Sequence, residues 1–314
     1  MAAANHFSPW HWAGFVLIVL VCLALDLGAF RRKSASGTFR ESLRWSVLWL
    51  LLALSLAAAL AVWRGPEQSL QFLAGYVVEY SLSLDNLFAM ALIFSWFGVP
   101  PPLQHRVLFW GIIGALVMRG LMIGAGMALL REWNWLLYFL GAFLLWAGCK
   151  WGFSRQAPVQ PEKNRLVRLA RKFFPVTRDF DGRKFFGLVA GRRALTPLAL
   201  ALLTIEATDL AFATDSIPAI FAVTQDPFLL FTSNICAVLG LRSLYFVLAG
   251  AMGCFRYLKT GVALVLVFIG SKMLLSHWQP VSTAVTLAVV AGVIGVSILL
   301  SLAALSGQGK ESSQ

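Results

Sequence analysis

The stretches EYSLSLDNLFA (residues 79–89) and DLAFATDSIPA (residues 209–219) share one pattern: an acid, five residues, a second acid and then a small polar residue. Each stretch lies inside a long apolar segment. In each half of the chain the next apolar segment carries one arginine, and the segment after it ends at a lysine; these residues are Arg119 and Lys150, then Arg242 and Lys272. Because all three marks recur in step, we predict that residues 70–151 and 200–276 are two copies of one three-helix unit.

The composition of the 314-residue chain indicates an integral membrane protein. Hydrophobic residues make up 59% of the chain, charged residues 13%, and the mean hydropathy of +0.76 lies outside the range of soluble globular domains. We therefore predict an all-α, polytopic membrane domain over residues 1–314 with about nine transmembrane helices. The predicted helices cover residues 11–30, 45–63, 70–97, 107–130, 133–151, 196–223, 228–250, 257–276 and 281–303.

The distribution of Lys and Arg predicts how the chain is oriented. If the N-terminus faces out, the inside segments hold 20 of the 26 Lys and Arg residues, whereas the outside segments hold only Arg64 and Arg131. By the positive-inside rule, the N-terminus is then periplasmic and the C-terminus cytoplasmic in a bacterial inner membrane. The net charge of +12 is thus explained by topology, and nucleic acid is not expected as a partner.

This orientation also relates the two three-helix units to each other. The helix with residues 79–89 would run from outside to inside, and the helix with residues 209–219 would run the other way. The units are then inverted repeats about a pseudo-twofold axis in the membrane plane, which is typical of secondary transporters. Between them lies a basic cytoplasmic linker, residues 152–195. Its basic and apolar residues at 165–174 fit either a short helix on the membrane surface or a disordered segment.

Six acidic residues fall inside the predicted membrane segments. A charged side chain in the middle of a membrane helix costs about 2.5–3.5 kcal/mol, so these acids need a compensating partner. A bound cation is one such partner, and pairing with the four repeat bases into a neutral, inert network is the alternative. Asn86 and Ser216 each follow the second acid of their repeat and are expected to be secondary ligands. The predicted metal ligands are Asp26, Glu79, Asp85, Asn86, Glu206, Asp209, Asp215 and Ser216.

Two local features are expected to bring more oxygen atoms to this site. Pro218 cannot donate a backbone hydrogen bond, so a break or kink beside Asp215 would free backbone carbonyls. In the other repeat, Ser81, Ser83 and Asn86 are expected to surround Asp85 with polar side chains.

The type of ligand narrows the choice of metal. The set contains carboxylates, an amide and hydroxyls but no His or Cys, which suits magnesium, calcium or manganese(II) and argues against copper and zinc. Ligand chemistry does not choose among these three ions. The sequence contains no nucleotide-binding loop and no hydrolase motif, so we predict neither an enzyme nor an organic cofactor. Because no nucleotide-binding motif is present to drive transport by ATP, we expect transport driven by the proton gradient, with protons as the second partner.

At these residues the sequence resembles the TerC family, and within it the Alx-type manganese exporters. The resemblance lies in residues 79–86, 99–107, 141–145, 212–224 and 232–242, and the Asp215-Ser-Ile-Pro-Ala-Ile-Phe motif is highly specific. It implies an integral membrane protein related to the lysine-exporter superfamily, with the membrane acids as metal-binding residues and manganese(II) as the exported ion.

The resemblance also implies two other roles. The family is associated with tellurium resistance, but carboxylates repel an oxyanion strongly in a low dielectric, so we expect any such effect to be indirect. Chloroplast relatives assist membrane-protein insertion, so a biogenesis factor that does not transport is the rival hypothesis. A scaffold of that kind has no evident need for six membrane acids.

The predicted topology can be tested with reporter fusions. A reporter at the C-terminus or within residues 152–195 is expected to appear cytoplasmic, and one at the N-terminus periplasmic. A cytoplasmic N-terminus would contradict the inverted-repeat argument, because the orientation of the repeats is derived from nine crossings and from the distribution of Lys and Arg.

Overall fold

The computed structural model describes residues 8–32, 39–133, 135–153, 168–169, 172–177, 179–189, 191–249, 257–275 and 281–311, and the structural statements below concern these residues. The expectation of a largely helical chain is confirmed. The helices are α1 (Pro9–Arg32), α2 (Phe39–Arg64), α3 (Pro66–Phe97), α4 (Pro101–Glu132), α5 (Leu136–Phe153), α7 (Pro197–Phe221), α8 (Pro227–Leu239), α9 (Leu241–Ala249), α10 (Leu258–Leu275) and α11 (Thr283–Glu311). Two short strands, β1 (Phe186–Val189) and β2 (Arg192–Leu195), precede α7.

The helices have the length and apolar character of membrane spans. Within the described ranges, seven spans are long and apolar enough to cross a membrane, and α8 with α9 forms one of them. Two shorter apolar stretches lie in α1 and α5. Many large hydrophobic side chains of α2, α4 and α11 are exposed on the outside of the bundle, as expected for a surface that faces lipid. The chain is therefore an all-α, multi-pass membrane protein.

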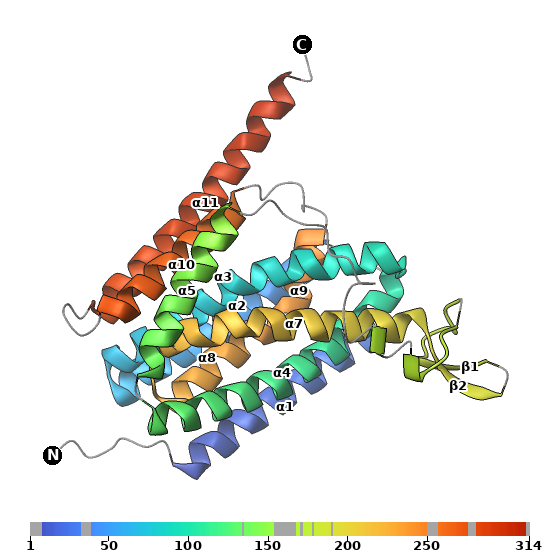
Figure 1. Cartoon of the computed structure of the whole chain (residues 1–314), viewed down its shortest axis with the longest axis horizontal. Coiled ribbons are helices and arrows are strands. Elements are labelled where there is room, and N and C mark those ends of the chain that lie inside the picture. The colour runs from blue at the N-terminus through green and yellow to red at the C-terminus, as the bar shows by residue number, and fades with distance from the viewer. Residues whose placement is uncertain are drawn as a thin grey trace.

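Helix α3 lies at the centre of the molecule. In α3, 72% of the most apolar window is buried, against 22% in α2 and in α11. Helix α3 packs against α2, α7, α8 and α11, and α4 packs against α7 and α8. Figure 1 shows α1, α4, α7 and α8 running side by side, while α5, α10 and α11 form a layer that is inclined to them. Functional side chains on α3, α4 and α7 are therefore held within the bundle.

Helices α5 and α10 approach each other closely because small residues line their contact. A Cβ atom on Gly270 would lie 2.7 Å from the backbone nitrogen of Leu145 and 2.8 Å from the carbonyl oxygen of Gly141. A Cβ atom on Gly148 would lie 2.8 Å from the carbonyl oxygen of Ala263. Close backbone approach through small residues is a common way to pack helices in a membrane. The two helices are antiparallel, because Gly141 near the start of α5 lies against Gly270, whereas Gly148 near its end lies against Ala263.

Two helical expectations require correction. The break expected beside Asp215 is not seen, because α7 continues through Pro218 to Phe221. The missing N–H leaves only the carbonyl of Thr214 without its usual donor, and one lost hydrogen bond in the last turn does not stop the helix. Conversely, the single helix predicted at 228–250 is interrupted at Gly240, which separates α8 from α9.

The basic linker differs from expectation at its C-terminal end. Strands β1 and β2 form an antiparallel hairpin, and Gly191 adopts φ of +76°, a conformation that glycine accepts without strain. Thr196 joins the hairpin to α7: its hydroxyl donates to the carbonyl of Lys184 (2.9 Å) and accepts from the backbone N–H of Ala199 (3.3 Å). Half of the surface helix proposed at 165–174 lies outside the described residues; of the other half, residues 168–169 and 172–173 are helical.

The contact between α5 and α10 predicts the effect of adding a methyl group. Gly270→Ala is expected to destabilise the protein by about 1–3 kcal/mol, because the new Cβ atom would overlap backbone atoms of α5. Gly292→Ala, in α11, is the matched control: no atom lies within 4 Å of its Cβ position, so no loss is expected. Thermal unfolding of the purified proteins in one detergent measures both. Equal stability of the two variants would contradict the packing described.

Candidate ion-binding site

Arg119 on α4 joins the first acids of the two repeats. Its guanidinium donates to Glu79 Oε1 on α3, and to Asp209 Oδ1 (3.0 Å) and Oδ2 (3.3 Å) on α7. The three side chains are 1%, 0% and 3% exposed. Buried charges are costly unless they are paired and hydrogen-bonded. This ion pair therefore ties three helices together at the centre of the bundle.

Neutral side chains complete the hydrogen bonding of both carboxylates. Ser83 donates to Glu79 Oε1 (3.1 Å), and Asn234 on α8 donates to Glu79 Oε2 (3.0 Å). Asn86 donates to Asp209 Oδ1 (3.0 Å). Every oxygen of the two carboxylates thus accepts at least one hydrogen bond, as buried charged groups require.

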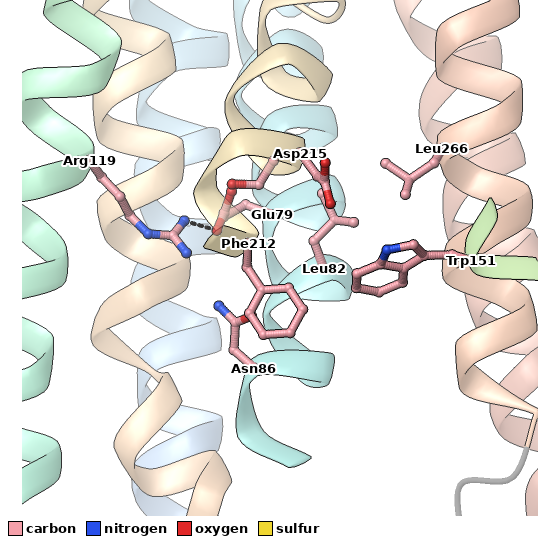
Figure 2. A pocket seen from close by; sticks show the side chains of 9 residues that line it. Glu79, Leu82, Asn86, Arg119, Trp151, Phe212, Asp215 and Leu266 are labelled. Atoms are coloured by element: carbon pink, nitrogen blue, oxygen red, sulfur yellow. Dashed lines mark hydrogen bonds and ion pairs between the residues drawn. The ribbon is translucent and has the colours of Figure 1, made fainter. Parts of the chain in front are cut away.

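A small cavity lies directly beside this ion pair, where α3 crosses α7 (Figure 2). Its volume is about 10 Å³, close to the space that one water molecule needs. Figure 2 shows Arg119 and Glu79 on one side, with Trp151 and Leu266 facing them across the gap. The cavity is lined by Glu79, Leu82, Asn86, Arg119, Trp151, Phe212, Asp215, Ser216 and Leu266.

The polar lining of this cavity offers unused oxygen atoms. Asn86 Oδ1 and Ser216 Oγ are buried and have no hydrogen-bond partner among the described residues. The carboxylate of Asp215 lines the same space and makes no ion pair within the described ranges. Buried oxygens that lack donors are suited to a cation, because a cation supplies the missing positive partner. The cavity thus has the chemistry of a small site for a hard metal ion.

Aromatic residues close the cavity on the side of α5. Trp151, in the last turn of α5, packs edge-on against Phe212 of α7, with ring centroids 5.7 Å apart. Phe212 lies about one helical turn before Asp215 and Ser216. The polar cavity is therefore shielded by apolar rings, which lowers the local dielectric and strengthens electrostatic interactions inside it.

The structure brings together five of the eight predicted ligands and leaves two, Glu206 and Asp85, apart from the cavity. The five around the ion pair and cavity are Glu79, Asn86, Asp209, Asp215 and Ser216. Glu206 lies one turn from Asp209, against Gly114 of α4, and its Oε2 is buried without a partner among the described residues. Asp85 does not line the cavity, although its Oδ2 is buried and likewise unpartnered there. Asp26 lies on α1, and its side chain is outside the described part of the structure.

Sequence reasoning missed one partner and misplaced two others. Asn234 was not among the expected residues; the only signal was an amide within an apolar helix, a pattern that often marks polar contacts between membrane helices. Ser83 and Ser81 were expected beside Asp85. Instead, Ser83 donates to Glu79, and Ser81 donates to the carbonyl of Val77 on its own helix.

The arrangement is not a complete all-acid metal site. Within the described residues, no three His, Cys, Asp or Glu side chains are close enough to hold one metal ion together. Glu79 and Asp209 instead pair with Arg119. Pairing of the membrane acids with the repeat bases was the alternative to metal binding in the sequence analysis. The amide and hydroxyl oxygens at the cavity and the carboxylate of Asp215 remain available.

Comparisons with known proteins give a consistent picture. Residues 64–309 match the model of the family described as "Integral membrane protein TerC family". A membrane protein of Myxococcus xanthus is 51% identical over 295 residues, which cover 94% of this chain and 92% of the relative. The protein Alx of Escherichia coli K12, named as a candidate membrane-bound redox modulator, is 41% identical over 303 residues and 94% of both chains. No solved structure matches the chain.

The ion pair predicts different stabilities for two similar variants. Asp209→Asn is expected to cost about 3–5 kcal/mol, because it removes one of the two buried charges that neutralise Arg119. Asp215→Asn makes the same chemical change but breaks no ion pair among the described residues, so we expect a loss below about 1 kcal/mol. Thermal unfolding of both purified variants tests this, and a larger loss in Asp215→Asn would contradict the pairing.

Proposed function

Because the chain belongs to the TerC family of integral membrane proteins, we propose that it transports a divalent metal cation across the bacterial inner membrane, with manganese(II) as the exported ion. The names of these relatives do not specify a metal, so manganese(II) is proposed from the resemblance to Alx-type exporters together with the ligand chemistry. Magnesium and calcium are the ions against which this choice must be tested.

The cavity at the crossing of α3 and α7 carries this proposal. It combines a carboxylate, Asp215, with two buried oxygens, Asn86 Oδ1 and Ser216 Oγ, that lack hydrogen-bond donors among the described residues. A scaffold for membrane-protein biogenesis would be served by the ion pair alone and has no evident use for such oxygens. Oxyanions such as tellurite would face carboxylates here, so direct tellurite transport is not favoured.

The packing of the helices supports the inverted-repeat arrangement with nine crossings. A pseudo-twofold axis would exchange α3 with α7, α4 with the α8–α9 span, and α5 with α10. It would then map the α3–α8 contact onto the α7–α4 contact, and both contacts are present. It would map the pairs α3–α7, α4–α8 and α5–α10 onto themselves, and these helices also pack together.

The residues at the cavity follow the same exchange. The axis would map the Asn86–Asp209 contact onto a Ser216–Glu79 pair, and Ser216 and Glu79 line one cavity. In transporters built from inverted repeats, the substrate site lies at the repeat interface near the bilayer midplane. This is the position proposed here for the metal, with the N-terminus periplasmic and the C-terminus cytoplasmic.

Coupling to the proton gradient is proposed as the energy source. A carboxylate must be deprotonated to bind a metal ion, so metal binding and proton release are linked at the same side chain. Membrane carboxylates that alternate between these two states would couple outward metal flux to inward proton flux.

The proposal is tested by metal flux in proteoliposomes that contain the purified protein. We expect manganese(II) to cross faster than magnesium or calcium, and to do so only when a pH step is applied. No manganese(II) flux under any pH step, from protein that is correctly inserted, would refute transport and favour the biogenesis role.

The same assay tests the site. Asp215→Asn is expected to lower manganese(II) flux at least about tenfold while the protein still folds, because Asn keeps an oxygen but loses the charge that a divalent ion requires. Asp181→Asn, on the exposed linker, is the matched control and should keep normal flux. Full flux in Asp215→Asn would refute the assignment of this residue as a ligand.

A further inference from the structure

We propose that Arg119 is an internal cation that holds Glu79 and Asp209 in the metal-free protein, and that a metal ion binds by displacing its guanidinium onto Glu206. This inference rests on the proposed function and adds to it a built-in competitor for the metal. It assigns Glu206 a different role from that of a ligand.

The hydrogen bonds show which carboxylate lone pairs Arg119 withholds from a metal ion. Glu79 Oε1 accepts from Arg119 and from Ser83, and Asp209 Oδ1 accepts from Arg119 and from Asn86. A carboxylate oxygen that already accepts two hydrogen bonds has no lone pair left for a metal ion. The guanidinium thus occupies one lone pair on Glu79 Oε1 and one on each oxygen of Asp209, and these lone pairs become available to a metal ion only after it has left.

Charge repulsion leads to the same conclusion. The guanidinium of Arg119 lines the same cavity as Asn86, Asp215 and Ser216. A divalent ion in that cavity would lie next to a buried positive charge in a medium of low dielectric, where like charges repel strongly. The metal and the guanidinium therefore compete for the same two carboxylates.

Glu206 is placed to receive the displaced side chain. It lies three residues before Asp209 on α7, which puts the two carboxylates on one helix face about 4.5 Å apart along the axis. Its Oε2 is buried and has no partner among the described residues. Its carboxylate contacts Gly114, and Gly114 lies on α4 as Arg119 does; any side chain at Gly114 would overlap the carboxylate.

The displacement leaves every one of these buried charges paired. Before metal binding, Arg119 neutralises one of the two charges of Glu79 and Asp209, and Glu206 has no ion-pair partner among the described residues. After binding, a divalent ion neutralises Glu79 and Asp209, and Arg119 neutralises Glu206. A movement of about one helical turn thus converts an ion-free site into a metal site with no unpaired charge among the four.

The test measures manganese(II) binding by titration calorimetry on the full-length chain in nanodiscs, and thermal stability with and without manganese(II). Arg119→Gln removes the competitor and is expected to lower the Kd for manganese(II) at least about tenfold. Glu206→Gln removes the receiving group and is expected to raise the Kd at least about tenfold. In the double variant the effect of Glu206→Gln should vanish, and the Kd should equal that of Arg119→Gln within about threefold.

Stability provides a second readout and a safeguard against misfolding. Without metal, Arg119→Gln is expected to unfold at a lower temperature than the wild type, and manganese(II) should raise its unfolding temperature more than that of the wild type. If Arg119→Gln does not fold, Arg119→Lys replaces it; Lys keeps the charge but loses the two-pronged geometry, so a smaller decrease in Kd is expected.

The outcomes separate this inference from the proposed function. Arg242→Gln, the repeat counterpart of Arg119, is the matched control and should leave the Kd unchanged within about threefold. An unchanged or higher Kd in Arg119→Gln, or a Glu206→Gln effect that persists in the double variant, would overturn the displacement while leaving transport intact. An absence of manganese(II) binding in the wild type and all variants would instead overturn the proposed function.

Discussion

The buried contact of Arg119 with Glu79 and Asp209 is the interaction on which the rest of the structure depends. Three ionised groups at the centre of an apolar bundle are tolerated only because they neutralise and hydrogen-bond one another. The contact fixes the relative positions of α3, α4 and α7. It also fixes the crossing of α3 and α7, and with it the cavity beside the ion pair. A change in this contact therefore changes stability and the ion site together.

The second constraint is the close contact of α5 and α10. The two helices approach at backbone distance through Gly141, Gly148 and Gly270, so they behave as one unit. Trp151 belongs to this unit, and its ring closes the cavity against Phe212 of α7. Helices α5 and α10 thus contribute Trp151 and Leu266 to the cavity lining, while α3, α4 and α7 contribute its charged and polar groups.

The sequence was sufficient to predict the helices, since long apolar runs specify membrane spans, and to single out Arg119 as a buried charge. It could not predict which acids Arg119 binds, because that depends on how α4 crosses α3 and α7. For the same reason Asn234 was missed: a neutral amide in an apolar helix carries no charge that demands a partner. The hairpin of residues 186–195 was also missed, because strands of four residues give little periodicity. The expected break at Pro218 failed because one lost hydrogen bond near a helix end does not stop the helix.

The small size of the cavity has a consequence for how ions are distinguished. A volume of about 10 Å³ accepts a bare ion or a single water molecule, but not an ion with its hydration shell. Any cation that enters must exchange its water ligands for protein oxygens. Magnesium gives up its water reluctantly and demands near-ideal octahedral geometry, whereas calcium prefers six to eight ligands in a larger cage. At the proposed metal site, the cost of dehydration would therefore contribute to ion selection in addition to the identity of the oxygen ligands.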